Sequence, residues 1–201
     1  MSAIPVPQQL STDFPTTVWA AQQPLWRVHR QCHDSAHFAT DQGGRFNPAE
    51  PAKGFGTWYL STHRAGAFVE VFGRFGRVIT RALIDERVLA QVWLPSDVRL
   101  ADLTHPTVLG RYGITNELST GGESIYPLAQ KWATALWVAG FSGIQYLSRH
   151  DVTLQTRSIA LFAKPADQPT FEAYARTQSL DETAAEMADL YGFTITAGNP
   201  L

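Results

Sequence analysis

The chain has 201 residues, of which 44% are hydrophobic, so it can bury one substantial core but is short for two full-sized domains. Sixteen Lys and Arg stand against 18 Asp and Glu, and this balance excludes the broad positive field of a protein that wraps nucleic acid or lies on a membrane surface. A single cysteine, Cys32, excludes an intrachain disulfide framework and suits a reducing compartment.

The sequence shows neither the apolar run of an export signal near its start nor the roughly 18 uncharged apolar residues of a membrane span. We therefore expect a cytoplasmic protein that has no direct contact with nucleic acid or membrane.

Residues 1–24 contain four prolines and no apolar periodicity, so we expect an arm that lies on the domain or becomes ordered on a partner. Alternating and β-branched residues predict strands at 25–29 and 57–61, separated by a polar loop that carries turn residues at 43–48. A helix is predicted over residues 61–73, with Ser61 or Thr62 as its cap, Glu70 beside its apolar face and Gly73 at its end.

Further elements follow to the end of the chain. Strands are predicted at 77–84, 90–94, 98–103, 143–147 and 158–162, a helix at 127–139, and a last helix docked on the domain after the capping pattern at 179–182. This mixed order indicates an α+β fold rather than regular βαβ winding. We expect a core domain at 25–165 and, at 166–201, a C-terminal helix and tail that dock on it.

One cluster has the residue types of a metal site. His29, Cys32, His33 and His37 fall within nine residues, but no second group of ligands follows nearby, so loop histidines beside a strand end are the favoured explanation. A metal-dependent hydrolase centred on these histidines is one functional alternative. Nothing matches a phosphate-binding glycine loop or the Gly-x-Ser-x-Gly motif of serine hydrolases.

Four blocks in a fixed order form a more specific pattern. LWRVHR, GGRFNP, FGTWYLSTHRAGAFVEVF and GIQYLSRHD together resemble the RES-domain family, named for its arginine, glutamate and serine, from about residue 25 to 162. The resemblance implies an ADP-ribosyltransferase-like α+β fold, with mixed or antiparallel sheets and flanking helices. It also implies a toxin that acts on NAD+ and is neutralised by an Xre-like antitoxin protein.

Matching the blocks residue by residue carries over the family's functional positions. The catalytic residues implied are Arg45, Glu70 and Ser148, and the residues implied to bind NAD+ are Arg27, Tyr59 and again Arg45. Where the family more often has Pro-Ser-Ala-Arg, this chain has Leu147-Ser148-Arg149-His150. No metal is implied, and no cofactor beyond NAD+ as substrate, with inorganic phosphate as a candidate co-substrate.

These residue types suit cleavage of the bond between nicotinamide and ribose. The transition state resembles an oxocarbenium ion, as in glycoside hydrolysis, and the leaving pyridinium needs no proton, so one carboxylate can suffice. Glu70 would stabilise the developing charge, Ser148 would orient Glu70, arginine forks would hold the pyrophosphate, and Tyr59 would stack on the substrate. A phosphate acceptor would need another cation, for which Arg149 and His150 are candidates.

The sequence leaves several alternatives open. The same fold could transfer ADP-ribose to a macromolecule, or it could be a catalytically silent interaction domain, in which case Glu70→Ala and Arg45→Ala would leave growth unchanged. The acceptor in NAD+ cleavage is either water or phosphate. Aromatic residues make up 11% of the chain, which leaves a homodimer within a toxin–antitoxin complex as an open option.

Overall fold

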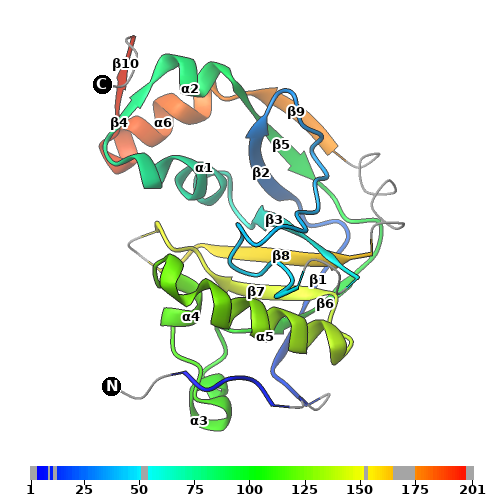
Figure 1. Cartoon of the computed structure of the whole chain (residues 1–201). Helices are drawn as coiled ribbons and strands as arrows, with labels where there is room; N and C mark the ends of the chain where they lie inside the picture. The colour runs from blue at the N-terminus through cyan, green and yellow to red at the C-terminus, as the bar shows by residue number, and fades with distance from the viewer. Residues whose placement is uncertain are drawn as a thin grey trace.

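A strongly twisted sheet of eight strands organises the chain (Figure 1). In this computed structural model, which describes residues 4–8, 10, 13–50, 54–151, 154–164 and 175–197, the strand order is β1-β6-β7-β8-β3-β2-β5-β9. Neighbouring strands are antiparallel except for β6 and β7, which are parallel. A separate parallel pair joins β4 and β10. The α+β class with a mixed, largely antiparallel sheet is confirmed.

The strands have the following bounds. They are β1 (Thr16–Trp19), β2 (Leu25–Arg30), β3 (Gly56–Ser61), β4 (Val78–Thr80), β5 (Arg87–Val92), β6 (Val98–Asp102), β7 (Gly143–Leu147), β8 (Arg157–Ala163), β9 (Ala175–Ser179) and β10 (Thr194–Thr196).

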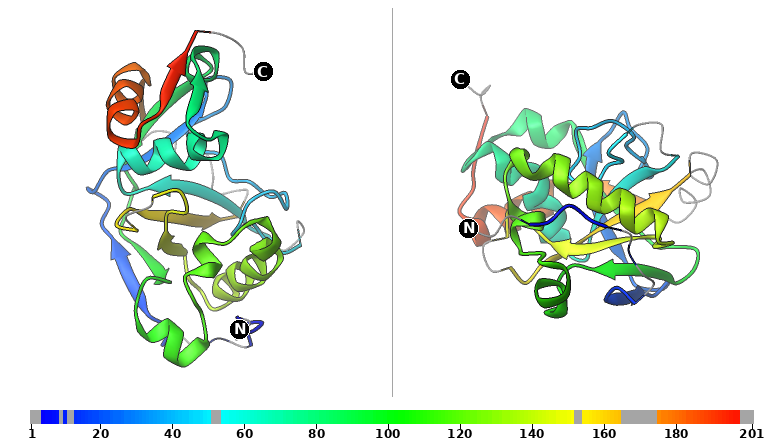
Figure 2. Two further views of the ribbon diagram at one scale, coloured as in Figure 1. Left: turned by 90° about the vertical axis from the view of Figure 1, so that its left-hand side faces the viewer. Right: turned by 60° about the horizontal axis from the view of Figure 1, so that its bottom comes forward.

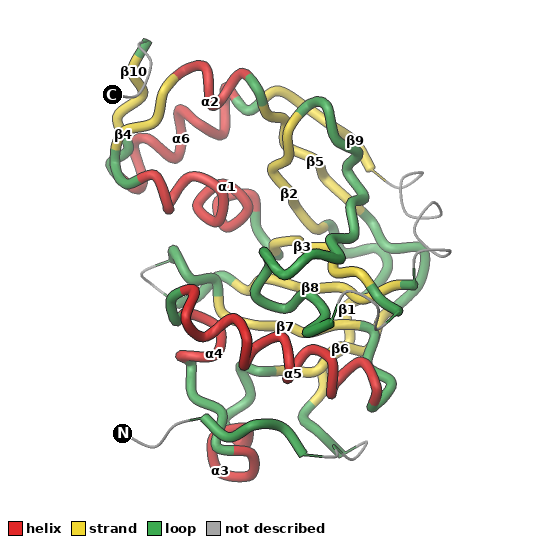
Figure 3. The backbone as a smooth tube through the Cα atoms, in the orientation of Figure 1, coloured by secondary structure: helices red, strands yellow, loops and turns green. Residues whose placement is uncertain are grey.

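The helices lie in two groups on the two halves of the sheet (Figures 2 and 3). One half carries α1 (Arg64–Phe72), the 3-10 turn η1 (Gly73–Phe75), α2 (Arg81–Asp85) and α6 (Asp181–Tyr191). The other carries α3 (Thr107–Tyr112), α4 (Glu117–Thr120), the 3-10 turn η2 (Glu123–Ile125) and α5 (Tyr126–Val138). None of the helices in these described segments is long and apolar enough to cross a membrane.

Three apolar clusters correspond to this arrangement. The first packs α5 residues such as Trp132 and Leu136 against Ile144 of β7, and the second packs Phe68 and Phe72 of α1 against β2, β5 and α6. The third lies on the other face of the sheet, around the fully buried Trp58. Alternation along β3 explains this division, because Trp58 and Leu60 face the third cluster whereas Tyr59 faces the first.

The sheet opens at one position between its two halves. β2 and β3 are paired only at Trp26 and Ser61, whereas β2 is paired with β5 along its whole length. The pair lies at the start of β2 and the end of β3, so the rest of the two strands is not paired with each other. Residues of both strands and of the loop between them line a cavity at this position.

Most elements lie where the sequence predicts them. β2, β3, β6, β7, β8 and α5 match their expected ranges within a few residues, and the terminal helix α6 docks with Leu180, Ala184 and Met187 buried in the second cluster. At the start of α6, the Ser179 hydroxyl accepts the amide hydrogen of Asp181 at 3.2 Å. At its end, Gly192 has φ of 67°, the left-handed conformation of a helix terminus. The domain boundary at 165/166 lies outside the described residues.

Other expectations are corrected. The segment at 77–84, predicted as one strand, is the short strand β4 followed by the helix α2. Thr80 caps the first turn of α2. The segment has too few apolar residues to distinguish the two-residue period of a strand from the 3.6-residue period of a helix. The cap of α1 is His63, whose Nδ1 accepts the Ala65 amide hydrogen at 3.3 Å, since Ser61 still belongs to β3. The predicted end of the helix at Gly73 is confirmed, because Gly73 is the C-cap of α1, and the chain continues from there as the 3-10 turn η1. Within the expected arm, β1 is an edge strand paired with β6.

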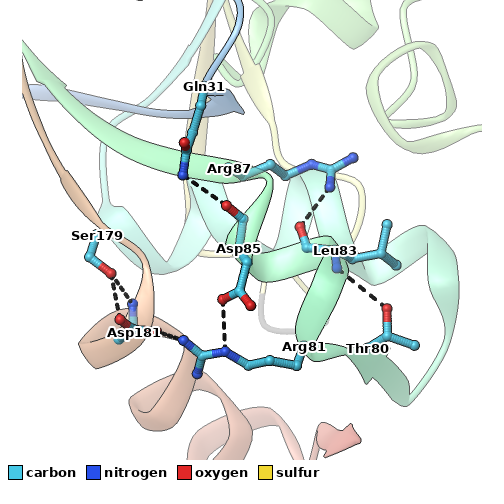
Figure 4. Close-up of polar contacts among 8 residues, drawn as sticks. All are labelled: Gln31, Thr80, Arg81, Leu83, Asp85, Arg87, Ser179 and Asp181. Atoms are coloured by element: carbon cyan, nitrogen blue, oxygen red, sulfur yellow. Dashed lines mark hydrogen bonds and ion pairs between the residues drawn. The ribbon is translucent and has the colours of Figure 1, made fainter. Parts of the chain in front are cut away.

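Polar contacts join α2 to its neighbours (Figure 4). Arg81 pairs with Asp85 at 2.7 Å and also with Asp181 at the start of α6, while the Gln31 amide donates to the Asp85 carbonyl at 2.8 Å. The Arg81 pairs are about half exposed, so they contribute little to stability. Their main effect is to fix α2 and α6 beside the end of β2.

Gly66 lies where α1 packs closely against Ser61 and Thr156. A Cβ at Gly66 would lie 2.3 Å from both the Ser61 hydroxyl oxygen and a Thr156 methyl carbon, so Gly66→Ala should lower the free energy of unfolding by about 1–3 kcal/mol. Gly110→Ala is the matched helical control, because a Cβ there meets nothing within 4 Å and alanine favours a helix. Urea denaturation measures both; an unchanged Gly66→Ala variant would contradict this packing.

Candidate active site

A cavity of about 370 Å³ lies where β2 and β3 diverge, between α1 and the segment from α4 to α5. Four of the predicted residues line it directly: Arg27, Arg45, Tyr59 and Glu70. The fifth, Ser148, is fully buried behind Glu70 and contacts it. The structure therefore brings the sequence-predicted residues together from elements that lie more than one hundred residues apart in the chain.

The carboxylate of Glu70 is fixed by two donors from the end of β7. Its Oε1 atom accepts a short hydrogen bond from the Ser148 hydroxyl and a second bond from the Arg149 amide at 2.8 Å. α1 holds Glu70 in place because Phe68, Val69 and Phe72 on the same helix are buried in the second apolar cluster. Glu70 itself is half-buried and faces the cavity.

Hydrogen bonds to the residues that precede β8 position Ser148. The Ser148 amide donates to the Thr156 carbonyl at 3.2 Å. The buried carboxylate of Asp151 accepts the amide hydrogens of Gln155 at 3.2 Å and Thr156 at 2.7 Å. A buried carboxylate that accepts backbone donors fixes this segment, so Ser148 reaches Glu70 without freedom to rotate away.

Arg45 forms the wall opposite Glu70. It is only 7% exposed and donates from Nη1 to the Leu118 carbonyl at 3.2 Å and from Nη2 to the Gly121 carbonyl at 2.7 Å. Its guanidinium carbon lies 4.8 Å from the centre of the Tyr126 ring, a cation–π contact. Burial lowers the pKa of Arg45, while Tyr126 opposes that effect. Arg45 thus holds the end of α4 and also brings positive charge to the cavity.

The loop that carries Arg45 is fixed by Tyr59. Its hydroxyl accepts the Phe46 amide hydrogen at 2.8 Å and donates to the Asn47 side-chain oxygen at 2.8 Å. A Cβ on Gly44 would lie 2.3 Å from that Asn47 oxygen and 2.6 Å from the Tyr59 hydroxyl, so only glycine fits there. This explains the Gly-Arg-Phe-Asn block physically: each residue keeps Arg45 in place against the strand.

Arg27 lies on the floor of the cavity and anchors the loop after β2. Its Nη1 donates to the carbonyls of Ser35 at 2.9 Å and His37 at 3.3 Å. Burial lowers the pKa of Arg27 to about 10, so the group remains charged at neutral pH.

Several lining residues were not assigned a role from the sequence. Glu123, Tyr126 and Tyr146 contribute to the wall, and Arg74 lies one helical turn after Glu70. Two spacings in the sequence could have indicated them. Glu70 and Arg74 are four residues apart, which places them on one helix face, and Tyr146 and Ser148 are two apart, which places them on one strand face. Burial raises the pKa of Tyr146, and Glu70 raises it further, so this hydroxyl stays protonated.

Arg149 and His150, the two candidate cations, both line the cavity. His150 packs against Gly73, where a Cβ would lie 2.8 Å from the histidine Cβ and Cγ atoms. The pKa of His150 is lowered below 6.5, mainly by burial and also by Arg149, Arg45 and Arg74, whereas Glu70 raises it. His150 is therefore largely neutral at pH 7, and the positive charge of the cavity comes from its arginines.

The histidine cluster does not form a metal centre. His29 is buried with Nδ1 beside the Arg30 carbonyl at 2.9 Å, while Cys32, His33 and His37 are exposed on the following loop. The rings of His33 and His37 form a T-shaped contact with 6.0 Å between their centroids. Over the described part of the chain, no three His, Cys, Asp or Glu side chains are grouped to hold a metal ion.

Comparison with known proteins identifies the family. A sequence model of the RES domain matches residues 24–186, more than three quarters of the chain. The chain belongs to the RES domain family. A search of curated proteins gives no match.

A solved structure shares the fold of this RES domain. A chain in the crystal structure of the MbcT-MbcA toxin–antitoxin complex from M. tuberculosis superposes with a TM-score of 0.62. The sequences are 16% identical, and the match covers 86% of this chain and 92% of that chain. At that identity the likeness concerns the fold alone.

The environment of His150 generates a pH prediction. In Glu70→Gln the negative charge that favours imidazolium is gone while the arginines remain, so the His150 pKa should fall further. Arg74→Gln should raise it, because one repelling cation is removed. Proton NMR titration of the histidine ring signals measures both shifts. A wild-type midpoint above 6.5, or a rise in Glu70→Gln, would contradict the described electrostatics.

Proposed function

We propose that this RES protein is the toxin of a type II toxin–antitoxin pair and that it degrades NAD+ by cleaving the nicotinamide–ribose bond. The observation that carries the proposal is the held Glu70 carboxylate. It lies in a cavity with Arg27, Arg45, Arg74 and Arg149, and its orientation is set by two hydrogen-bond donors. A carboxylate fixed among these cations suits a substrate with an anionic pyrophosphate and a cationic reacting group, and Glu123 is the second carboxylate in the cavity lining.

Bond cleavage in this site needs no general acid. As the bond between C1′ of the ribose and the pyridinium nitrogen breaks, its electron pair passes to the ring and nicotinamide leaves as a neutral molecule. Positive charge then develops on the ribose, and the Glu70 carboxylate stabilises it. The stabilisation is specific to the transition state because Ser148 and Arg149 hold the carboxylate in one orientation before the substrate arrives.

The arginines and tyrosines account for substrate binding. Arg27 and Arg45 each direct donors into the protein, but a guanidinium has five, and those left over would contact the pyrophosphate oxygens. The Tyr59 ring lines the cavity between Arg45 and Glu70 and would stack on the nicotinamide or ribose. The hydroxyl of Tyr59 is committed to the Phe46 and Asn47 bonds, so its role toward substrate would be that of its ring.

Water or inorganic phosphate would complete the reaction by forming a bond to C1′. Attack by water releases a proton to solvent and yields ADP-ribose, whereas attack by phosphate yields the 1-phosphate. Arg149 would supply the charge that a phosphate acceptor needs, with the adjacent His150 as a neutral hydrogen-bonding group. Both acceptors belong to the proposal, and analysis of the products distinguishes them.

The partner proposed for this toxin is an Xre-like antitoxin protein. Two facts support it: membership of the RES family and the fold shared with a chain of a solved toxin–antitoxin complex. We further propose that the pair acts in the cytoplasm, where NAD+ is available. A homodimer within the complex remains part of the proposal and is tested by light scattering of the purified pair.

Controlled expression in a bacterial host, with intracellular NAD+ followed alongside growth, tests the function. Wild type should drain NAD+ and stop growth, while Glu70→Gln should do neither, because removing the charge should slow turnover by at least about 10³-fold. Glu182→Gln is the matched control, since Glu182 lies on α6 outside the cavity and should leave both effects intact.

Other outcomes identify the alternatives. Growth arrest with NAD+ unchanged, together with label from radioactive NAD+ retained on protein or nucleic acid, would favour an ADP-ribosyltransferase. No effect of either wild type or Glu70→Gln on growth and NAD+ would favour a silent interaction domain.

A further inference from the structure

Three arginines meet beside the cavity, at the end of α1. Arg30 of β2 and Arg87 of β5 are direct partners in the antiparallel register, so their side chains lie on the same face of the sheet. That face is the one covered by α1, as Val28 and Leu89, the next pair along the same face, belong to the cluster packed on Phe68 and Phe72. Arg74 follows α1 in η1.

Arg87 occupies the centre of this group. It is 5% exposed, donates from Nη1 to the Leu83 carbonyl at 2.6 Å and lies 5.7 Å from the centre of the Phe72 ring. Burial lowers the pKa of Arg87, and the positive charges of Arg30 and Arg74 lower it further. Arg30 and Arg74 therefore each repel the guanidinium of Arg87.

The like charges in this arrangement oppose folding. Like charges directly opposite on neighbouring strands are destabilising, and a buried cation loses its hydration. Among the described residues, the carboxylate paired with this group is Glu86, 3.7 Å from Arg87 and 60% exposed. Three cations and one carboxylate leave an excess of two positive charges, which matches a phosphate monoester, with a charge of about −1.5 to −2 at pH 7.

The group is continuous with the proposed active site. Arg74 also lines the cavity, and it lies four residues, or about 6 Å along the helix axis, beyond Glu70. A substrate held with its reacting ribose at Glu70 could therefore place a second anionic group near Arg74. Arg30 is exposed at the end of β2, so the group is accessible from solvent.

We propose that Arg30, Arg74 and Arg87 form a phosphate-monoester subsite that binds the additional phosphate on the adenosine ribose of NADP+. This inference rests on the proposed function, because the dinucleotide reaches the subsite from the cavity. Arginine suits the role, since its planar fork contacts phosphate oxygens in pairs. The subsite makes NADP+ a better ligand than NAD+.

Calorimetric titration of the full chain carrying Glu70→Gln tests the subsite without turnover. NADP+ should bind about tenfold more tightly than NAD+, as expected for a charged hydrogen-bonded group. Adding Arg30→Gln should remove most of that advantage while leaving NAD+ affinity within about twofold, because Arg30 lies outside the cavity lining. Arg77→Gln, an exposed neighbour of η1, is the matched control and should change neither affinity.

The outcomes separate this inference from the proposed function. Equal affinities for the two dinucleotides, or equal losses in Arg30→Gln, would overturn the subsite when inorganic phosphate also fails to bind in an Arg30-dependent way, and NAD+ consumption by wild type would then still support the proposed function. Binding of inorganic phosphate alone that Arg30→Gln abolishes, without preference for NADP+, would support the subsite with free phosphate as its ligand. If neither dinucleotide nor phosphate binds, the subsite falls, and the NAD+ proposal falls if wild type also leaves NAD+ intact.

Discussion

The hydrogen bonds that Glu70 accepts from Ser148 and Arg149 connect two halves of a sheet that is open between them. Glu70 belongs to the half that carries α1 and α6, and Ser148 to the half that carries α5. Because β2 and β3 share a single paired position, side-chain contacts across the gap keep the halves in register. The contact between Arg45 and the carbonyls of Leu118 and Gly121 supports the opposite wall in the same way. The side chains that form the site therefore also stabilise the elements that position them.

This arrangement has a cost in electrostatic free energy. Arg27 and Arg45 lose hydration in the folded chain, and burial lowers the pKa of each. Each offsets part of that cost with bonds to backbone carbonyls that would otherwise lack donors. An anionic ligand would satisfy the remaining donors, so ligand binding should stabilise the fold. The same reasoning applies to Arg87, which donates to the Leu83 carbonyl and whose ion-pair partner, Glu86, is mostly exposed.

The sequence predicts much of the fold because local pattern and tertiary packing agree there. The apolar run at 143–147 and the amphipathic stretch at 127–139 became β7 and α5 almost unchanged. Prediction failed where the chain is short or polar, as at α2, where Thr80 decides between strand and helix, and at the exposed edge strand β9. The core residues of the site could be assigned only through resemblance to the RES family, since their elements meet by long-range pairing. Arg74 and Arg87 were missed because the charges that make them notable are adjacent only in three dimensions.

Release of nicotinamide from NAD+ by the purified chain, followed by proton NMR, tests the central claim most directly. The account predicts that wild type produces free nicotinamide together with ADP-ribose or its 1-phosphate, and that Glu70→Gln binds NAD+ without producing it. An intact NAD+ spectrum with wild-type protein would contradict the account, as would equal rates for the two proteins. Either result would leave the RES fold in place but remove Glu70 from the chemistry assigned to it.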